Sequence, residues 1–253
     1  AEFGADVVAS YMRHVQANMV VLPADLADAF EAYCRKNSRP CPLLERLPRG
    51  FPRTRVLASA ADLRRDLPRY RVYEGRQAAW REVDDLMDLW QPDDVAFLLG
   101  CSFSLEQALL AAGLPVRHME EGKNVPMYLT RRDTDPVPPF GGRLVVSMRP
   151  IPEALVDRAR AATERHTFAH GAPVHVGDPA ALGVRDLARP EWGDAVTIRP
   201  GEVPVFWACG VTSQVALLDA LRAGDLDRAL THAPGHMFIG DATNDELLGR
   251  GEL

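Results

Sequence analysis

Two segments of this 253-residue chain share one unusual pattern. The first, VAFLLGCSFSLEQALL, runs from Val95 to Leu110, and the second, VPVFWACGVTSQVALL, from Val203 to Leu218. Each reads as an apolar strand, a small residue, a cysteine, a turn of small and hydroxyl residues, and an amphipathic helix. Cys101 and Cys209 therefore occupy matching strand-to-helix turns. The pattern predicts an α/β fold with an internal pseudo-repeat whose two turns face one small site.

A strand-to-helix turn of this kind has defined chemistry. The helix N-terminus presents unpaired N–H groups and a partial positive charge, so it attracts carboxylate or phosphate. The same field lowers the pKa of a thiol and favours the thiolate. Two facing turns would bind a small anion with two acidic groups, beyond the carboxyl ends of the strands. The alternative is that both cysteines are buried and structural, which is common in apolar surroundings.

Composition excludes several classes of protein. With 47% hydrophobic and 25% charged residues, the chain is neither disordered nor collagen-like. A net charge of -6 argues against nucleic acid as a partner. No stretch approaches the roughly 20 apolar residues of a membrane span, so we expect no membrane partner either. Four cysteines without a CxxC motif predict no disulfide scaffold and no structural zinc site. The first residues lack the features of a secretory signal, and we expect a cytoplasmic location.

The rest of the chain suggests how the repeat is arranged. The first ninety residues read mostly as helix and loop, and one helix, Ile151–Thr163, interrupts a middle region of short strand-like runs. These runs are Leu114–His118, Arg143–Met148, Pro173–Val176 and Ala195–Ile198. We predict a larger α/β/α part, residues 1–113 plus 201–253, and a smaller two-layer part, residues 114–200, inserted between its halves. This division requires both repeat strands to lie in one sheet.

Histidines gather in loops that glycine and proline punctuate. Five of the seven lie in such clusters, at His118, His170, His175, His232 and His236. Loop histidines that a rigid scaffold brings together are candidates for general acid–base catalysis. Their spacing matches no specific metal site, and no nucleotide-cofactor, P-loop or hydrolase-elbow motif occurs. Arg149 ends a strand-like run where it could clamp a carboxylate, although an ordinary surface arginine is the alternative.

Long, unusual strings follow one another along the chain. They include FLLGCSFSLE at 97–106, NVPMY at 124–128, LVVSMRP at 144–150, HGAPVHVGDP at 170–179, VFWACGVT at 205–212 and THAPGHM at 231–237. In these motifs the sequence resembles the D-glutamate cyclase family of bacterial hydro-lyases. The sequence differs from the family's usual residues at Leu129, Arg131, Arg132 and Ser213, and these differences leave the cysteine and histidine motifs intact.

The resemblance implies a fold and an activity. The fold would be a three-layer α/β/α sandwich joined to a smaller two-layer α/β part. The activity would be the cyclisation of D-glutamate, or a similar carboxylate, to 5-oxo-D-proline with loss of water. No cofactor is firmly predicted, and a divalent ion, Mn²⁺ or Mg²⁺, and a homo-oligomeric state are left open.

The residues themselves suggest roles in such a reaction. We predict as catalytic Cys101, His118, Cys209 and His232. We predict as substrate-binding Ser102, Ser104, Asn124, Arg149, His170, His175, Asp178, Thr212 and His236. His118 or His232 would take a proton from the amine, turn N–H groups would hold the developing oxyanion, and Arg149 would hold the α-carboxylate. Two alternatives are a cofactor-independent racemase that uses Cys101 and Cys209, and a non-catalytic protein that binds a small dicarboxylate.

Overall fold

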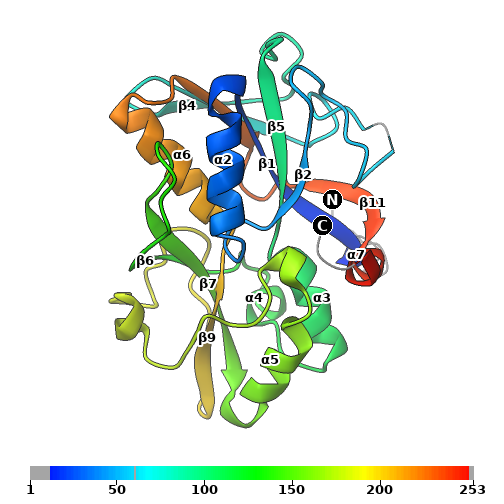
Figure 1. Ribbon diagram of the computed structural model, residues 1–253. Coiled ribbons are helices and arrows are strands. Elements are labelled where there is room, and N and C mark those ends of the chain that lie inside the picture. The colour runs from blue at the N-terminus through cyan, green and yellow to red at the C-terminus, as the bar shows by residue number, and fades with distance from the viewer. Residues whose placement is uncertain (1–11, 60, 251–253) are drawn as a thin grey trace.

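Two β-sheets form the framework of the computed structural model, which describes residues 12–59 and 61–250 (Figure 1). The larger sheet has the spatial order β2 (Leu43–Arg46), β5 (Asp94–Gly100), β1 (His14–Pro23), β10 (Arg228–His232), β3 (Tyr70–Glu74) and β4 (Ala79–Val83), and β11 (Phe238–Thr243) also pairs with β1. The smaller sheet has the order β6 (Met127–Asp133), β7 (Arg143–Pro152), β9 (Glu202–Ala208) and β8 (His175–Val176). The described strand pairs are all antiparallel. This arrangement confirms the predicted α/β class at the level of two helix-covered sheets.

Helices cover the sheets on defined faces. Helices α2 (Ala24–Lys36) and α6 (Val211–Ala223) pack on one face of the larger sheet, where Phe30 and Leu217 share a core with Phe97. A second core covers the other face of the larger sheet, extends to the smaller sheet, and includes side chains from the helices α3 (Phe103–Ala111) and α5 (Val156–Thr163). The short helices α4 (Arg117–Glu120) and α7 (Asn244–Arg250) complete the set. None of these described helices has the length and apolar character that a membrane crossing requires.

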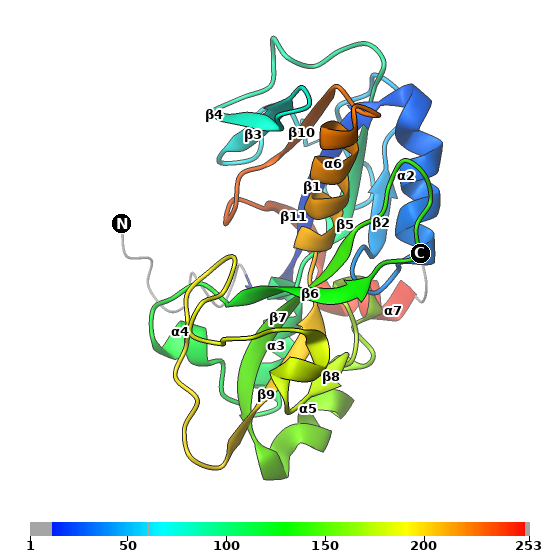
Figure 2. The same ribbon diagram turned by 90° about the vertical axis from the view of Figure 1, so that its left-hand side faces the viewer.

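Each of the two strand–cysteine–helix segments passes from one half of the molecule to the other. Strand β5 lies in the larger sheet, but helix α3 after it lies beside α5 of the smaller half (Figures 1 and 2). Strand β9 lies in the smaller sheet, but helix α6 after it packs beside α2 on the larger sheet. The prediction that both repeat strands share one sheet is therefore wrong. Residues 201–208 do not belong with 1–113, because β9 pairs with β7 and β8.

Other predicted elements also differ from those in the structure. Arg143–Met148 is a strand, but it continues to Pro152 because its residues pair with β9, so the predicted helix Ile151–Thr163 begins only at Val156. Leu114–His118 is not a strand: the Val116 carbonyl accepts hydrogen bonds from two later N–H groups and starts α4. Ala195–Ile198 also forms no strand. Local alternation of apolar residues cannot distinguish these outcomes, since the deciding partner is distant in sequence.

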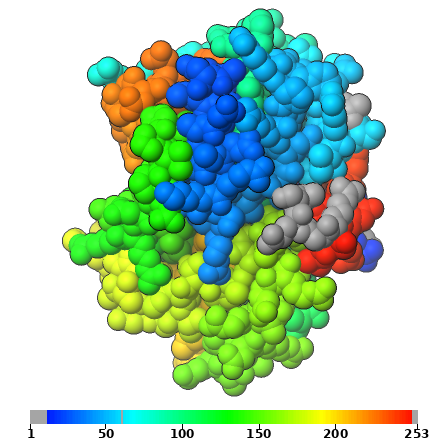
Figure 3. Space-filling model, in the orientation of Figure 1, coloured from blue at the N-terminus to red at the C-terminus, as the bar shows by residue number. Residues whose placement is uncertain are grey.

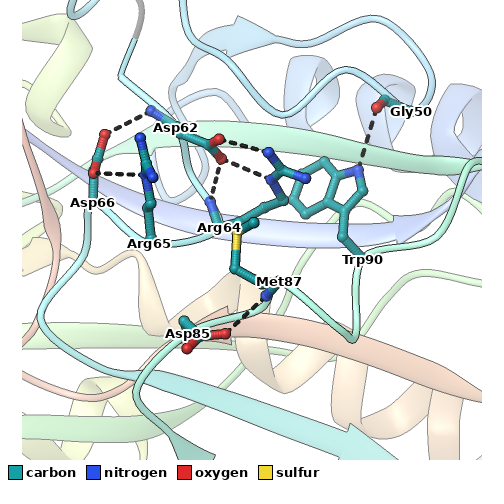
Figure 4. A network of polar contacts seen from close by, with 8 residues as sticks. All are labelled: Gly50, Asp62, Arg64, Arg65, Asp66, Asp85, Met87 and Trp90. Atoms are coloured by element: carbon teal, nitrogen blue, oxygen red, sulfur yellow. Dashed lines mark hydrogen bonds and ion pairs between the residues drawn. The ribbon is translucent and has the colours of Figure 1, made fainter.

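Two long connections of the larger sheet are tied to each other by polar contacts (Figure 4). The Asp62 carboxylate accepts two hydrogen bonds from the Arg64 guanidinium, at 2.9 Å and 2.7 Å, and the Asp62 N–H donates to the Asp66 carboxylate. The Leu86 N–H donates to the Arg64 carbonyl, and the Trp90 indole N–H to the Gly50 carbonyl. These contacts hold the segments after β2 and β4 together, without contributing to the strand ends described next.

Candidate active site

The carboxyl ends of three strands meet between the two sheets. Strands β5 and β10 flank β1 and both run antiparallel to it, so they point the same way and end at the same edge of the larger sheet. The end of β9 reaches this edge from the smaller sheet. Gly210, two residues after β9, packs so closely here that a Cβ added to it would lie 2.2 Å from Nδ2 of Asn18 and 3.6 Å from the Gly100 carbonyl oxygen. Asn18 also donates a hydrogen bond to that carbonyl. Ligands commonly bind at such strand ends in α/β proteins.

The turns at Cys101 and Cys209 have the same local hydrogen bonds. The N–H two residues after each cysteine, that of Phe103 or Val211, hydrogen-bonds the sulfur. The hydroxyl three residues after each cysteine accepts a bond of 3.0 Å from the N–H of a neighbouring strand: Ser104 from Gln16, and Thr212 from Val145. The predicted substrate-binding hydroxyls of Ser104 and Thr212 are thus used to anchor strands.

Both thiols are protonated at neutral pH. Burial raises the pKa of Cys101 to about 12 and that of Cys209 to about 11, although the N–H hydrogen bond on each sulfur acts in the opposite direction. The prediction that the helix N-termini lower these pKa values is therefore wrong, because the cost of removing a thiolate from water is larger. The charge of Arg149 acts on both thiols, which places Arg149 near both turns.

Three charged or titratable side chains form a buried group beside the first turn, here called the acid–base cluster: Glu106 of α3, His118 of α4 and Arg149 of β7. Arg149 Nη2 donates to Glu106 Oε1 at 2.5 Å, and His118 Nε2 lies 3.0 Å from the same oxygen. Each of the three is at most 2% exposed. Burial would raise the pKa of Glu106, but the charge of Arg149 and the contact with His118 outweigh it and lower that pKa. Glu106 is therefore ionised.

Arg149 is held by more than its carboxylate partner. Its Nη1 donates to Ser147 Oγ at 3.0 Å, and its guanidinium carbon lies 5.6 Å from the centre of the Trp207 ring. Its Nε has no hydrogen-bond partner within the described part of the chain. A fully buried N–H without a partner is rare in folded proteins, and an arginine donor of this kind has the chemistry to bind a carboxylate.

Two further predicted histidines are buried and neutral. Nδ1 of His232 lies 3.2 Å from the Met19 N–H and 3.5 Å from the Met19 carbonyl; the shorter contact, in which the N–H donates to Nδ1, places the ring proton on Nε2. Nδ1 of His170 lies 2.7 Å from the Arg39 carbonyl and donates to it. Burial lowers the pKa of each ring to about 4. His236, which follows β10, is half-buried and contacts the Pro234 carbonyl.

Three predicted binding residues are not brought to the acid–base cluster. The ring of His175 packs against Phe206, with centroids 5.7 Å apart, and Phe206 faces the opposite side of the smaller sheet from Trp207, its neighbour in sequence. Asp178 caps a short helix by accepting a hydrogen bond from an N–H two residues later. Asn124 is exposed. Ser102, in contrast, is buried at the start of α3 directly after Cys101.

The sequence analysis missed Glu106. It is the single acidic residue of an otherwise largely apolar helix, FSLEQALLA, and it lies beside Leu105 on the buried side. A carboxylate in that position must find a cationic or hydrogen-bonding partner, which is the signal that could have identified it. No three His, Cys, Asp or Glu side chains in residues 12–59 and 61–250 are grouped so as to hold a metal ion.

Comparison with known proteins defines the class. Proteins named "Putative hydro-lyase" are 50% identical in Bacillus velezensis, over 96% of this chain and 89% of theirs, and 53% identical in Bordetella petrii, over 92% and 87%. A third, in Bacillus subtilis, is 48% identical over 92% and 89%. The molecule is thus an enzyme of the lyase class.

The family follows from a second comparison. The family model for D-glutamate cyclase matches residues 95–241, and this chain belongs to the D-glutamate cyclase family. The matched range starts in β5 and ends in β11, so it contains both cysteine turns and the whole acid–base cluster. Among solved structures, a nitrogen repressor-like protein from Methanococcus jannaschii aligns with a TM-score of 0.42 and 8% identity, over 92% of this chain and 86% of that chain.

Proposed function

We propose that this enzyme cyclises D-glutamate to 5-oxo-D-proline and water. The observation that carries the proposal is the buried acid–base cluster of Glu106, His118 and Arg149, whose arginine charge acts on the cysteines at the N-termini of α3 and α6. Such a cluster combines a group that moves protons with a cation that binds carboxylate. Membership of the D-glutamate cyclase family supports the same substrate class.

The reaction sets the chemistry that the site must supply. The α-amine attacks the γ-carboxyl carbon, a carbon–nitrogen bond forms, and one carbon–oxygen bond of that carboxyl breaks. The ammonium loses two protons, and the departing oxygen needs two protons to leave as water. The protons balance within the substrate, so the enzyme needs only a group that carries them from nitrogen to oxygen. No redox step is involved.

His118 is the proposed proton carrier. The Glu106 carboxylate lies 3.0 Å from Nε2 of its ring, so Glu106 orients the ring, as a positioning residue. The other ring nitrogen then serves the amine. Arg149, with its unpartnered Nε, is assigned to a substrate carboxylate. A well-placed acid or base of this kind contributes roughly 10²–10⁴-fold to the rate.

His232 takes a different role from the one first predicted. Its Nδ1 already accepts the Met19 N–H, and its pKa of about 4 makes it a weak base. A neutral imidazole with its proton on Nε2 is instead a hydrogen-bond donor for an oxygen on which negative charge develops. The Phe103 and Val211 N–H groups already bond the cysteine sulfurs, so the N–H groups of Ser102 and Gly210 would support the same oxygen.

The matched cysteine turns also motivate a second function, a cofactor-independent racemase. That mechanism uses one thiol and one thiolate on opposite sides of the α-carbon. The raised pKa values of Cys101 and Cys209 leave little thiolate at neutral pH, which favours the cyclase. The two reactions differ in the fate of the α-hydrogen: racemisation exchanges it with solvent, and cyclisation keeps it.

The test is an NMR time course of the purified enzyme with D-glutamate in deuterated buffer, with and without Mn²⁺ or Mg²⁺. We expect 5-oxoproline that retains its α-hydrogen, and at least about 100-fold slower turnover for His118→Gln. His175→Gln is the matched control and should keep full activity, since His175 lies on the other face of the smaller sheet. Loss of the α-hydrogen without ring closure would instead indicate the racemase. Binding of D-glutamate without turnover would indicate a dicarboxylate-binding protein.

A further inference from the structure

A pocket of about 950 Å³ is lined by residues from the C-terminal end of α2, helix α5 and helix α7, elements that lie on the molecular face shown in Figure 3. Its apolar wall includes Leu43, Leu44, Phe168, Leu247 and Leu248. None of these residues belongs to the acid–base cluster or to the cysteine turns. The pocket thus has a lining that the proposed reaction does not use.

The pocket carries an excess of positive charge. Four arginines line it: Arg35, Arg39, Arg160 and Arg165. Arg35 pairs with Glu31, and Arg39 donates to backbone carbonyls, but Arg160 and Arg165 form no ion pair within residues 12–59 and 61–250. Among the lining residues described, the acidic one is Glu164. Burial and the charge of Arg160 lower the pKa of Arg39, which shows that these cations repel one another. A bound anion would relieve that repulsion.

His170 adds a second, independent feature to the lining. It is 1% exposed, and its Nδ1–H donates to the Arg39 carbonyl. Its Nε2 therefore carries a lone pair and no proton, and this atom has no hydrogen-bond partner in the described part of the chain. Buried polar atoms are nearly always partnered, so this unpartnered acceptor, on a residue that lines the pocket, is available to a ligand that donates a hydrogen bond.

We propose that this pocket binds an oxyanion that carries its own hydroxyl, the chemistry of inorganic phosphate and of organic phosphates with a free hydroxyl group. Arg160 and Arg165 hold the negative charge, and Nε2 of His170 accepts the ligand's O–H. Arginine is suited to this because its planar donors match phosphate oxygens. The apolar wall accommodates the carbon part of an organic phosphate.

The pocket lies directly behind the first cysteine turn. A Cβ on Gly100 would lie 1.6 Å from the Phe168 carbonyl oxygen and 3.0 Å from Pro42 Cγ, and both Phe168 and Pro42 line the pocket. One layer of residues therefore separates the proposed anion from the turn that carries Cys101. The charge of Arg149 also acts on His170, so His170 lies between the proposed anion site and the acid–base cluster.

The proposal makes a selective prediction about two simple anions. At neutral pH, phosphate retains at least one proton and can donate to Nε2, whereas sulfate has none. Calorimetric titration at constant ionic strength should show phosphate binding about tenfold more tightly than sulfate. Arg160→Gln should weaken both by about tenfold or more. Arg158→Gln, on the same helix but outside the pocket lining, is the matched control and should change neither.

The variant His170→Asn isolates the acceptor. The asparagine amide can still donate to the Arg39 carbonyl, and asparagine tolerates the positive φ of +81° at this position. It offers nothing in place of Nε2, so we expect the preference for phosphate over sulfate to disappear while sulfate binding persists. Thermal unfolding of each variant checks that it is folded.

Three results would overturn the proposal. They are equal binding of the two anions by the unaltered protein, unchanged affinity in Arg160→Gln, and loss of phosphate binding in His118→Gln rather than in Arg160→Gln, which would place the anion at the active site. Glycerol 3-phosphate separates the two sources of this chemistry. Tighter binding than inorganic phosphate supports an organic phosphate as ligand, and weaker binding supports free phosphate.

Discussion

The two cysteine turns have the same backbone and different chemistry. Both sulfurs accept the N–H two residues ahead, and both hydroxyls three residues ahead anchor a strand. Five residues after each cysteine the segments diverge: the first has Glu106, buried against Arg149, and the second has Gln214, which lines a smaller pocket of about 280 Å³. The repeated sequence pattern thus specifies the same turn twice, and the side chain five residues after the cysteine decides that only the first turn carries a charge.

The largest effect should come from breaking the charged pair at the first turn. Arg149→Met leaves Glu106 buried without its cation, and we expect the free energy of unfolding to fall by about 3–5 kcal/mol. Gln214→Leu, the corresponding change at the second turn, should cost less than about 1 kcal/mol because no charge is left unpaired. Urea unfolding of both variants measures the difference.

A double variant sharpens this result. If the loss comes from the unpaired carboxylate, Glu106→Leu combined with Arg149→Met should recover much of it, because replacing a whole buried ion pair is often nearly neutral. A double variant as unstable as Arg149→Met alone would show that packing around Trp207, rather than charge, causes the loss.

The next largest effect is the pH dependence of stability that comes from the neutral histidines His170 and His232. Each lies beside a segment that packs against one of the two turns. His170 follows Phe168, which contacts Gly100, and His232 accepts from Met19, next to Asn18 at the second turn. Burial lowers the pKa of each from 6.5 to about 4. Their contribution to stability is complete above pH 6.5 and is lost as the pH falls toward 4, by about 3 kcal/mol for each ring.

Urea unfolding at several pH values between 7 and 4 tests this. His170→Asn and His232→Gln should each lose less stability on acidification than the unaltered protein, by a similar amount. A pH dependence that neither substitution changes would assign the acid sensitivity to other groups, and a change in only one would show that the two surroundings differ.

Close packing distinguishes the turns by smaller amounts. The glycine precedes the cysteine in the first turn (Gly100) and follows it in the second (Gly210). A Cβ on Gly100 would meet the backbone oxygen of Phe168, whereas one on Gly210 would meet the end of the Asn18 side chain, which can move. We expect Gly100→Ala to cost about 3 kcal/mol and Gly210→Ala about 1 kcal/mol, measured by thermal unfolding. The reverse order would contradict this account.

The smallest difference should be in thiol reactivity. Since both thiols have pKa values raised well above the ordinary 9, alkylation of each should still be accelerating at pH 10. Mass spectrometry after iodoacetamide treatment of the folded protein, with Cys101→Ser and Cys209→Ser as references, identifies the modified residue. Rates that level off near pH 7 at either position would reveal a thiolate and favour the racemase.

Sequence reasoning succeeded where the information is local. The strand, turn and helix around Cys101 and Cys209 follow from a few adjacent residues. It failed where strand pairing decides the position of an element, because nothing within residues 201–208 shows which of the two sheets β9 joins. The single acidic residue Glu106 was overlooked for a related reason: its partners, Arg149 and His118, lie on other elements.

The first strand also determines when the active site can form. Residues Val20 and Ala17 of β1 pair with Thr231 of β10 and Phe238 of β11, which lie more than two hundred positions later in the chain. During synthesis β1 cannot complete its pairing until β10 and β11 have left the ribosome. Closing so long a loop is slow and makes folding depend on contacts of high sequence separation. Strand β1, with Asn18 between the two turns, thus depends on partners far along the chain, and catalysis cannot begin before β10 and β11 have been synthesised.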